Sequence, residues 1–294
     1  MNQELLQQMS TRKGFIAALD QSGGSTPKAL KLYGINEDKY SGDDEMFDMV
    51  HKMRSRIIKS RAFNSDRILG AILFENTLDR DIDGMPTSQY LLEKGILPFL
   101  KVDLGLADVQ NDAQMMKPIG DLDDKLKKAV ANNVFGTKMR SVIKKANAQG
   151  IKDVVAQQFD IAKKIIGYGL VPIIEPEVDI NAPDKAQAEE ILKQEIKAQL
   201  QTLGNDDKVI FKLTLPEVPN FYADLIGEPH TVRVVALSGG YPQAEANAKL
   251  AQNNGVIASF SRALSETLNV DQTDEEFDTT LGKAIEGIYE ASVK

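Results

Sequence analysis

The segment from residue 170 to residue 215 contains the pattern that decides the fold. It begins with the apolar run LVPIIEPE (170–177), continues through an amphipathic stretch (184–203), and ends with a second apolar run, KVIFKLTL (208–215). The two runs are typical of buried strands, and the stretch between them has the length of a helix. A strand, a helix and a further strand in this order predict parallel pairing through a right-handed crossover.

The same pattern recurs along the whole chain. Eight strand-like runs are separated by polar turns and longer amphipathic stretches: Gly14–Asp20, Ile68–Phe74, Ile96–Asp103, Gly136–Val142, Leu170–Glu177, Lys208–Leu215, Thr231–Ser238 and Gly255–Ser261. Expected helices include Asp44–Ser60, Leu122–Asn132, Asp153–Gly169, Asp184–Leu203 and Gln243–Asn253, with Asp184 as an N-cap and Pro242 just before a helix. Eight such units predict an α/β fold, a single-domain (β/α)₈ TIM barrel over residues 1–294. A doubly wound open sheet is the alternative.

The composition excludes several classes of site. The chain has 294 residues, a net charge of −8 and no cysteine, so disulfides, zinc–thiolate centres and cysteine nucleophiles are ruled out. Its two histidines, His51 and His230, are too few for a three-histidine metal centre. An acidic chain does not have the basic face expected of a nucleic-acid-binding protein. We therefore expect a protein that uses no metal and no other cofactor.

No segment has the features of a membrane-targeting sequence. The N-terminus is polar and carries no basic segment, unlike a signal peptide. The longest nearly apolar stretch, Ile165–Ile174, contains two glycines and a proline and is shorter than the about 20 residues that span a bilayer. We expect a cytoplasmic protein without a membrane partner.

Ionisable residues gather where the predicted strands end. Asp20 ends the first run, and later runs carry polar pairs spaced by two residues: Lys101 with Asp103, Lys138 with Arg140, Glu175 with Glu177, and Lys212 with Thr214. Residues two apart face the same side of a strand, and their apolar neighbours then face the helices. Any one of these charges could be a solvated tip or part of a structural ion pair. Five strands with inward-facing charge favour an active site at the barrel mouth.

Lys212 is the candidate nucleophile. It lies in the apolar run Val209–Leu213, where loss of hydration disfavours an ammonium group and favours the neutral amine. A neutral amine attacks carbonyl groups. The alternative is a lysine that only pairs with Glu175 or extends its ammonium group to solvent.

Two turns resemble phosphate-binding sites. Ser238-Gly239-Gly240 follows the seventh run, and Arg262 follows the eighth, where barrels of this kind usually hold a phosphate. A second glycine-rich turn, Gln21–Ser25, follows Asp20. Two such turns at the barrel mouth predict a substrate with two phosphates.

Seven segments, taken in order and spacing, resemble class I fructose-bisphosphate aldolase: Ala18–Ser22, Ile72–Glu75, Lys101–Asp103, Lys138–Arg140, Val171–Glu177, Leu237–Gly240 and Ser261–Leu264. The resemblance implies reversible cleavage of fructose 1,6-bisphosphate to dihydroxyacetone phosphate and glyceraldehyde 3-phosphate through a lysine Schiff base. It also implies that no metal takes part. By this resemblance Lys212 is the Schiff-base lysine.

The resemblance also implies the roles of the other residues. Glu175 corresponds to the main acid/base carboxylate, Asp20 to the aspartate near the C3 and C4 hydroxyls, and Lys138 to a lysine that positions and polarises the substrate. Glu177 is an electrostatic neighbour. Lys101 and Arg140 resemble residues near the C6 phosphate, with Ser22 and Ser25 in the adjoining turn. The residues that resemble the C1-phosphate site are Ser238, Gly239, Gly240 and Arg262.

The chain departs from the family at two places that bear on function. Gln21 stands where many members have a glutamate, and the chain stops at Lys294 without the family's C-terminal tyrosine tail, which handles proton exchange at the carbanion carbon. Alternative functions are a tagatose 1,6-bisphosphate aldolase, another Schiff-base sugar-phosphate lyase, or a barrel that binds sugar phosphates without turnover. The expected partner is a small sugar phosphate, and both a monomer and a homo-oligomer are open.

Overall fold

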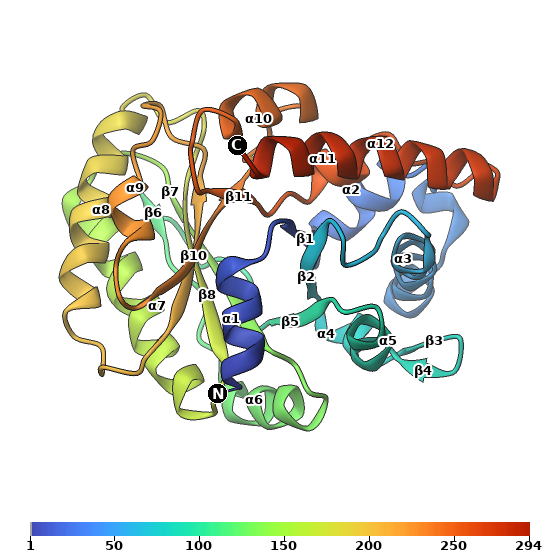
Figure 1. Ribbon diagram of the computed structural model, residues 1–294, viewed down its shortest axis with the longest axis horizontal. Coiled ribbons are helices and arrows are strands. Elements are labelled where there is room, and N and C mark those ends of the chain that lie inside the picture. Colours follow the sequence, from blue (N-terminus) through green and yellow to red (C-terminus); the bar gives the residue numbers. More distant parts are fainter. Residues whose placement is uncertain (1) are drawn as a thin grey trace.

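Eight parallel strands form the centre of the molecule (Figure 1). The computed structural model describes residues 2–294. In sheet order the strands are β1 (Phe15–Leu19), β2 (Ile68–Leu73), β5 (Leu97–Lys101), β7 (Gly136–Ile143), β8 (Val171–Val178), β9 (Val209–Thr214), β10 (Thr231–Leu237) and β11 (Ile257–Ala258). β1 also lies beside β11, where the Ala18 N–H donates to the Phe260 carbonyl at 3.2 Å. The predicted barrel is confirmed, and each of the eight predicted runs corresponds to one of its strands.

Helices cover the outside of the barrel (Figure 1). They are α2 (Ser25–Leu32), α3 (Gly42–Lys59), α4 (Glu75–Leu78), α5 (Thr87–Glu93), α6 (Leu122–Ala131), α7 (Ala148–Gly167), α8 (Lys185–Leu200), α9 (Ala223–Ile226), α10 (Gln243–Leu250), α11 (Arg262–Ser265) and α12 (Asp274–Ser292), with a short 3₁₀ turn at Glu37–Lys39. Three short strands lie outside the ring. β3 (Asp81–Ile82) and β4 (Met85–Pro86) form a hairpin, and β6 (Ala113–Gln114) runs antiparallel to β7.

The structure moves the start of one predicted helix and confirms the start of another. α7 begins at Ala148 rather than at Asp153, because the side chain of Asn147 accepts the N–H groups of Gln149 and Gly150 and caps the helix there. Asp184 occupies the N-cap position of α8, as predicted, although its side chain makes no capping hydrogen bond.

The alternation of side chains along each strand divides the core into two layers. The apolar residues predicted to face the helices do so, in the layer between strands and helices: Leu100, Val102, Met139, Ile174, Phe211 and Leu213. A second layer fills the barrel interior, with Phe99 and Ile173 among its members. Above it, toward the carboxyl ends of the strands, the inward side is polar. Strand periodicity alone therefore separates the core of this protein from its cavity.

An N-terminal helix closes the opposite end of the barrel. α1 (Gln3–Thr11) lies against β10 (Figure 1), and Met9 packs into the interior layer together with Leu5 and Leu6. The side chain of Arg233 on β10 donates to the Met9 carbonyl at 2.7 Å. α1 thus covers the apolar end of the barrel and leaves the polar end open.

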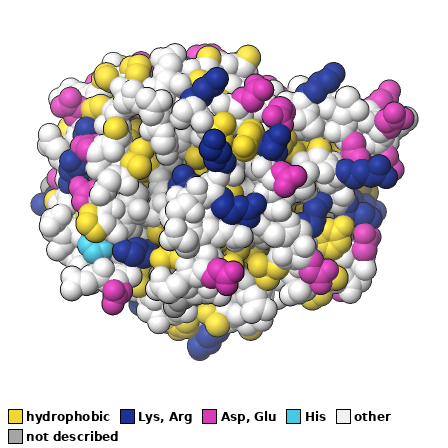
Figure 2. Space-filling view, viewed as in Figure 1, with side chains coloured by type: hydrophobic (Ala, Val, Ile, Leu, Met, Phe, Trp, Pro, Cys, Tyr) yellow, Lys and Arg dark blue, Asp and Glu magenta, His cyan; other side chains and the backbone are white. Residues whose placement is uncertain are grey.

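Positive and negative side chains are interspersed on the face in Figure 2, without a broad area of one sign. A nucleic-acid-binding surface would show a basic stripe or patch, which this face does not. Within residues 2–294, none of the helices combines the length and the apolar character required to cross a membrane.

Candidate active site

One cavity of about 590 Å³ opens at the carboxyl ends of the barrel strands. All thirteen residues predicted from the sequence line it: Asp20, Ser22, Ser25, Lys101, Lys138, Arg140, Glu175, Glu177, Lys212, Ser238, Gly239, Gly240 and Arg262. They come from seven strands or the segments that follow them. Parallel strands bring their carboxyl ends together, so residues far apart in the sequence meet in one place.

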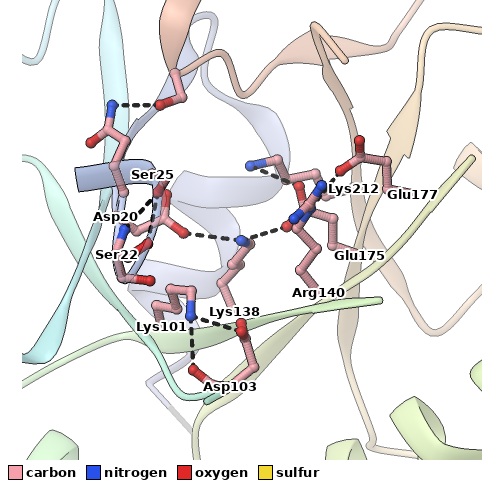
Figure 3. Close-up of polar contacts among 12 residues, drawn as sticks. Asp20, Ser22, Ser25, Lys101, Asp103, Lys138, Arg140, Glu175, Glu177 and Lys212 are labelled. Atoms are coloured by element: carbon pink, nitrogen blue, oxygen red, sulfur yellow. Dashed lines mark hydrogen bonds and ion pairs between the residues drawn. The ribbon is translucent and has the colours of Figure 1, made fainter. Parts of the chain in front are cut away.

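Lys138 lies at the centre of the buried charges (Figure 3). Its Nζ is 3.0 Å from Asp20 Oδ2 and 2.7 Å from Glu175 Oε2, and all three side chains are buried. Burial by itself would lower the pKa of Lys138, but the two carboxylates outweigh it and raise the pKa above its ordinary range. Lys138 is thus held as a permanent cation.

Asp20 is the counterpart of this cation. Burial alone would raise the pKa of Asp20, but the ammonium groups of Lys138 and Lys212 together lower it well below its ordinary value. Asp20 therefore stays ionised at neutral pH. An ionised carboxylate accepts hydrogen bonds, so Asp20 is suited to bind hydroxyl groups of a substrate.

Lys212 has fewer carboxylate partners than Lys138. Its Nζ is 3.2 Å from Glu175 Oε1, and its side chain is only 4% exposed although it lines the cavity. Lys101 donates to both the carboxylate and the carbonyl of Asp103, at 2.7 Å each. Within residues 2–294, Lys212 contacts a single carboxylate oxygen, whereas Lys138 and Lys101 each have two oxygen partners. Lys212 therefore has fewer oxygen partners than either Lys138 or Lys101.

Glu175 links the two central lysines. Its two oxygens are divided between Lys138 and Lys212, so one carboxylate contacts a permanent cation and the candidate nucleophile (Figure 3). On the next inward position of β8, Glu177 Oε2 accepts from Arg140 Nε at 2.5 Å. Glu175 is within reach to exchange protons with whatever is attached to Lys212.

The rim of the cavity carries the two predicted phosphate-binding turns. Gly239 and Gly240 adopt positive φ values of 59° and 118°, which glycine tolerates best, and Arg262 donates to the Gly240 carbonyl. In the other turn, Ser25 Oγ donates to the Ser22 carbonyl at 2.8 Å and accepts the Ser22 N–H at 3.0 Å. The structure thus brings Arg262 to the Gly-Gly turn, and both turns face the same cavity.

Sequence reasoning missed several residues of this site. Gln21 Nε2 donates to Ser261 Oγ at 2.7 Å and thereby joins the loops that follow the first and last strands. Behind it, the fully buried Arg54 of α3 donates to the Gln21 carbonyl and to Thr77 Oγ1. Burial lowers the pKa of Arg54 to about 10. The serines and glycines that follow Gln21 indicate a turn but not its contact with Ser261. No pattern in the sequence of α3 distinguishes Arg54 as part of the site.

The cavity offers no grouping typical of a metal centre. Among residues 2–294, no three His, Asp or Glu side chains converge as they would around a metal ion. The carboxylates of the cavity are instead distributed among lysine and arginine side chains, which occupy the oxygen atoms that a cation would need.

Comparisons with known proteins point to one family. The family model described as fructose-bisphosphate aldolase class-I matches residues 3–221. The chain is similar to fructose-bisphosphate aldolase class 1 of Clostridium acetobutylicum, with 62% identity over 294 residues, which is 100% of both chains.

A solved structure shows the same fold at much lower sequence similarity. It is fructose-bisphosphate aldolase from Plasmodium falciparum, in complex with TRAP and a small-molecule inhibitor. The TM-score is 0.72 at 19% identity, covering 99% of this chain and 94% of that one. Together with the family model and the full-length relative, these findings show that the chain belongs to the class-I fructose-bisphosphate aldolase family.

Proposed function

We propose that this protein reversibly cleaves fructose 1,6-bisphosphate to dihydroxyacetone phosphate and glyceraldehyde 3-phosphate through a Schiff base on Lys212. One observation carries the proposal: of the four lysines that line the cavity, Lys212 alone combines a single carboxylate contact with burial beside Glu175. The 62% identity to a protein named as this aldolase supports the choice of substrate.

The first stage forms the covalent intermediate. The neutral amine of Lys212 attacks the C2 carbonyl of the open-chain ketose and gives a carbinolamine. Glu175, 3.2 Å from Nζ, takes the proton that the Lys212 ammonium group loses and gives it to the departing hydroxyl, so water leaves and an iminium ion remains. Lys138, held charged by Asp20 and Glu175, donates hydrogen bonds to the substrate and keeps it in position.

The second stage breaks the carbon–carbon bond. Glu175, now ionised, takes the proton of the C4 hydroxyl, the C3–C4 bond breaks, and its electron pair moves to the iminium nitrogen to form an enamine. Glyceraldehyde 3-phosphate leaves, the enamine is protonated at C3, and water hydrolyses the resulting imine to release dihydroxyacetone phosphate. Asp20 accepts hydrogen bonds from the hydroxyls near C3 and C4 throughout.

The rim residues hold the two phosphates. The Gly239–Gly240 turn and Arg262 bind the C1 phosphate, and the turn of Ser22 and Ser25, with Lys101 and Arg140 nearby, binds the C6 phosphate. Backbone N–H groups and cations at the mouth of an otherwise acidic chain also attract a substrate with two anionic phosphate groups.

The test is to reduce the Schiff base and locate it. The protein is treated with borohydride in the presence of dihydroxyacetone phosphate, and the modified peptide is identified by mass spectrometry. We expect one adduct, on Lys212, and cleavage of fructose 1,6-bisphosphate in a coupled assay. An adduct on Lys138 or Lys101 would contradict the assignment, and faster cleavage of tagatose 1,6-bisphosphate would overturn the choice of substrate.

A further inference from the structure

The pairing of β8 with β9 ends just before the two residues that we propose as acid/base and nucleophile. β8 pairs with β7 along all eight of its residues, but with β9 only at Ile173–Ile210 and Ile174–Phe211. The next position of each strand is Glu175 on β8 and Lys212 on β9. The ladder between β8 and β9 therefore does not include this pair, although Glu175 pairs with Arg140 on β7 and Lys212 with Val235 on β10.

Two prolines limit the pairing of β8 with β9, Pro172 before the paired residues and Pro176 beyond them. The Val171 N–H donates toward β7, to the Phe135 carbonyl at 3.2 Å. Successive residues of a strand direct their main-chain groups to opposite sides, so the even-numbered residues of β8 face β9. Pro172 and Pro176 are two of these, and proline has no N–H to donate. β8 is left with two N–H donors toward β9, those of Ile174 and Val178.

A threonine hydroxyl rejoins the strands beyond the unpaired stretch. The Val178 N–H donates to Thr214 Oγ1 at 2.9 Å, and the Thr214 hydroxyl donates to the Val178 carbonyl at 2.7 Å. One side chain thus serves both main-chain groups of Val178, and it is almost fully buried. The pair Glu175 and Lys212 lies between this bridge and the last ladder position.

A second side chain holds the main chain of Glu175 from outside the barrel. Gln158 of α7 accepts the Glu175 N–H with its Oε1 at 2.9 Å and is completely buried. Its Nε2 has no partner within the described residues, so Gln158 keeps this contact at the cost of an unsatisfied amide group. A buried amide that makes one hydrogen bond, to this one residue, is suited to positioning.

We propose that Thr214, with Gln158, is a positioning residue that sets the 3.2 Å separation of Lys212 Nζ and Glu175 Oε1. The proposal rests on the proposed function, in which these two groups exchange protons through the substrate. Proton transfer requires heavy atoms about 2.6–3.2 Å apart, and a displacement of about 1 Å costs on the order of 100-fold in rate. The bridge acts on the reaction through Glu175 and Lys212 without touching the substrate.

The experiment compares Thr214→Val, which keeps the shape and removes both hydrogen bonds, with Thr214→Ser, which keeps the hydroxyl. Thr137→Val is the matched control, because Thr137 is a fully buried threonine of β7 whose hydroxyl has no partner within residues 2–294. For each variant kcat, KM, the pH dependence of kcat and the rate of borohydride trapping are measured with intact protein.

We expect Thr214→Val to lower kcat about 10- to 100-fold with KM changed less than about threefold, and Thr214→Ser to restore most of the rate. The acidic limb of the kcat profile should move for Thr214→Val and stay for Thr137→Val. If Thr214→Val keeps kcat within about threefold and only loses thermal stability, the role is structural and the proposal is overturned.

A second pair of variants, at Gln158, tests the same proposal. If Thr214→Val does not fold, Gln158→Leu replaces it, with Gln158→Glu as the variant that retains an acceptor oxygen. An unchanged kcat in Gln158→Leu would then overturn the proposal. Failure of the proposed function would look different, since the unmodified protein itself would give no adduct on Lys212.

Discussion

Two lysines of equal burial lie near the end of β9 and differ in the number of their oxygen partners. Lys212 and Lys185 both have side chains that are 4% exposed. Lys185 Nζ has three oxygen partners: Glu189 Oε1 at 2.6 Å, the Leu215 carbonyl at 2.8 Å and Glu217 Oε1 at 3.1 Å. Three acceptors match the three N–H groups of an ammonium ion. Lys212 has one such partner and a cavity beside it.

The difference shows that burial does not by itself make a lysine a nucleophile. The Lys185 cluster joins the start of α8 to the loop after β9, so its ammonium group is used for structure. Lys212 contacts a single carboxylate oxygen, and the cavity leaves room for a substrate beside it. The two lysines thus differ in the number of their acceptors and in their access to the cavity.

The largest expected effect separates the two lysines by activity. Lys212→Met should lower kcat/KM for fructose 1,6-bisphosphate by at least about 10⁴-fold, because no covalent intermediate forms. Lys185→Met should retain a borohydride adduct on Lys212. A coupled cleavage assay with mass mapping checks both, and cleavage by Lys212→Met at more than a hundredth of the original rate would remove Lys212 from the mechanism.

The next effect separates the two carboxylates that contact these lysines. Glu175→Gln should lower kcat about 10²- to 10⁴-fold, because the amide cannot donate and accept the protons of both stages. Glu189→Gln is the matched control on the structural side and should leave kcat within about threefold. Equal losses of kcat in Glu175→Gln and Glu189→Gln would mean that the rate depends on the structure of the loop after β9 and not on proton transfer.

The third effect concerns the free energy of unfolding, and here the change is expected at Lys185. Lys185→Met should lower the free energy of unfolding by about 3–5 kcal/mol, since it leaves the buried Glu189 without its main partner. The double variant Lys185→Met/Glu189→Leu should recover much of this loss, because it removes the unpaired charge. Urea unfolding measures both, and a Lys185→Met variant as stable as the original would show that water reaches Glu189.

The smallest effect is a difference in the pH dependence of stability. The pKa of Asp20 is lowered in the folded protein, so its contribution is present above the unfolded value of about 3.9 and is lost as the pH falls below it. Burial raises the pKa of Glu189, and Lys185 only partly offsets this. The contribution of Glu189 is thus present below its unfolded value of about 4.3 and is lost as the pH rises through its folded value.

Urea unfolding between pH 3 and pH 7 tests these opposite signs. As the pH falls toward 3, the free energy of unfolding should decrease less in Asp20→Asn than in the original protein. As the pH rises toward 7, it should decrease less in Glu189→Gln than in the original protein. Curves that change in the same direction for both variants would contradict the stated pKa directions.

Most of the site follows from the sequence because it depends on strand periodicity. A residue two positions from another faces the same way, and parallel strands end at one edge, so Lys138, Glu175 and Lys212 had to share a cavity once the barrel was correct. The glycine turn at Gly239 and the position of Arg262 follow from the same rule. Local patterns also give the strands and most helices.

Contacts between residues distant in sequence were decided only by the tertiary structure. Nothing local indicates that Lys138 is held by two carboxylates while Lys212 has one, or that Lys185 lies buried among three acceptors. The role of Thr214 was equally hidden, since its partner Val178 is on another strand. A sequence determines which way a side chain faces, because that depends on its own strand. Whether a proton is free depends on neighbours that only the folded chain brings within hydrogen-bond distance.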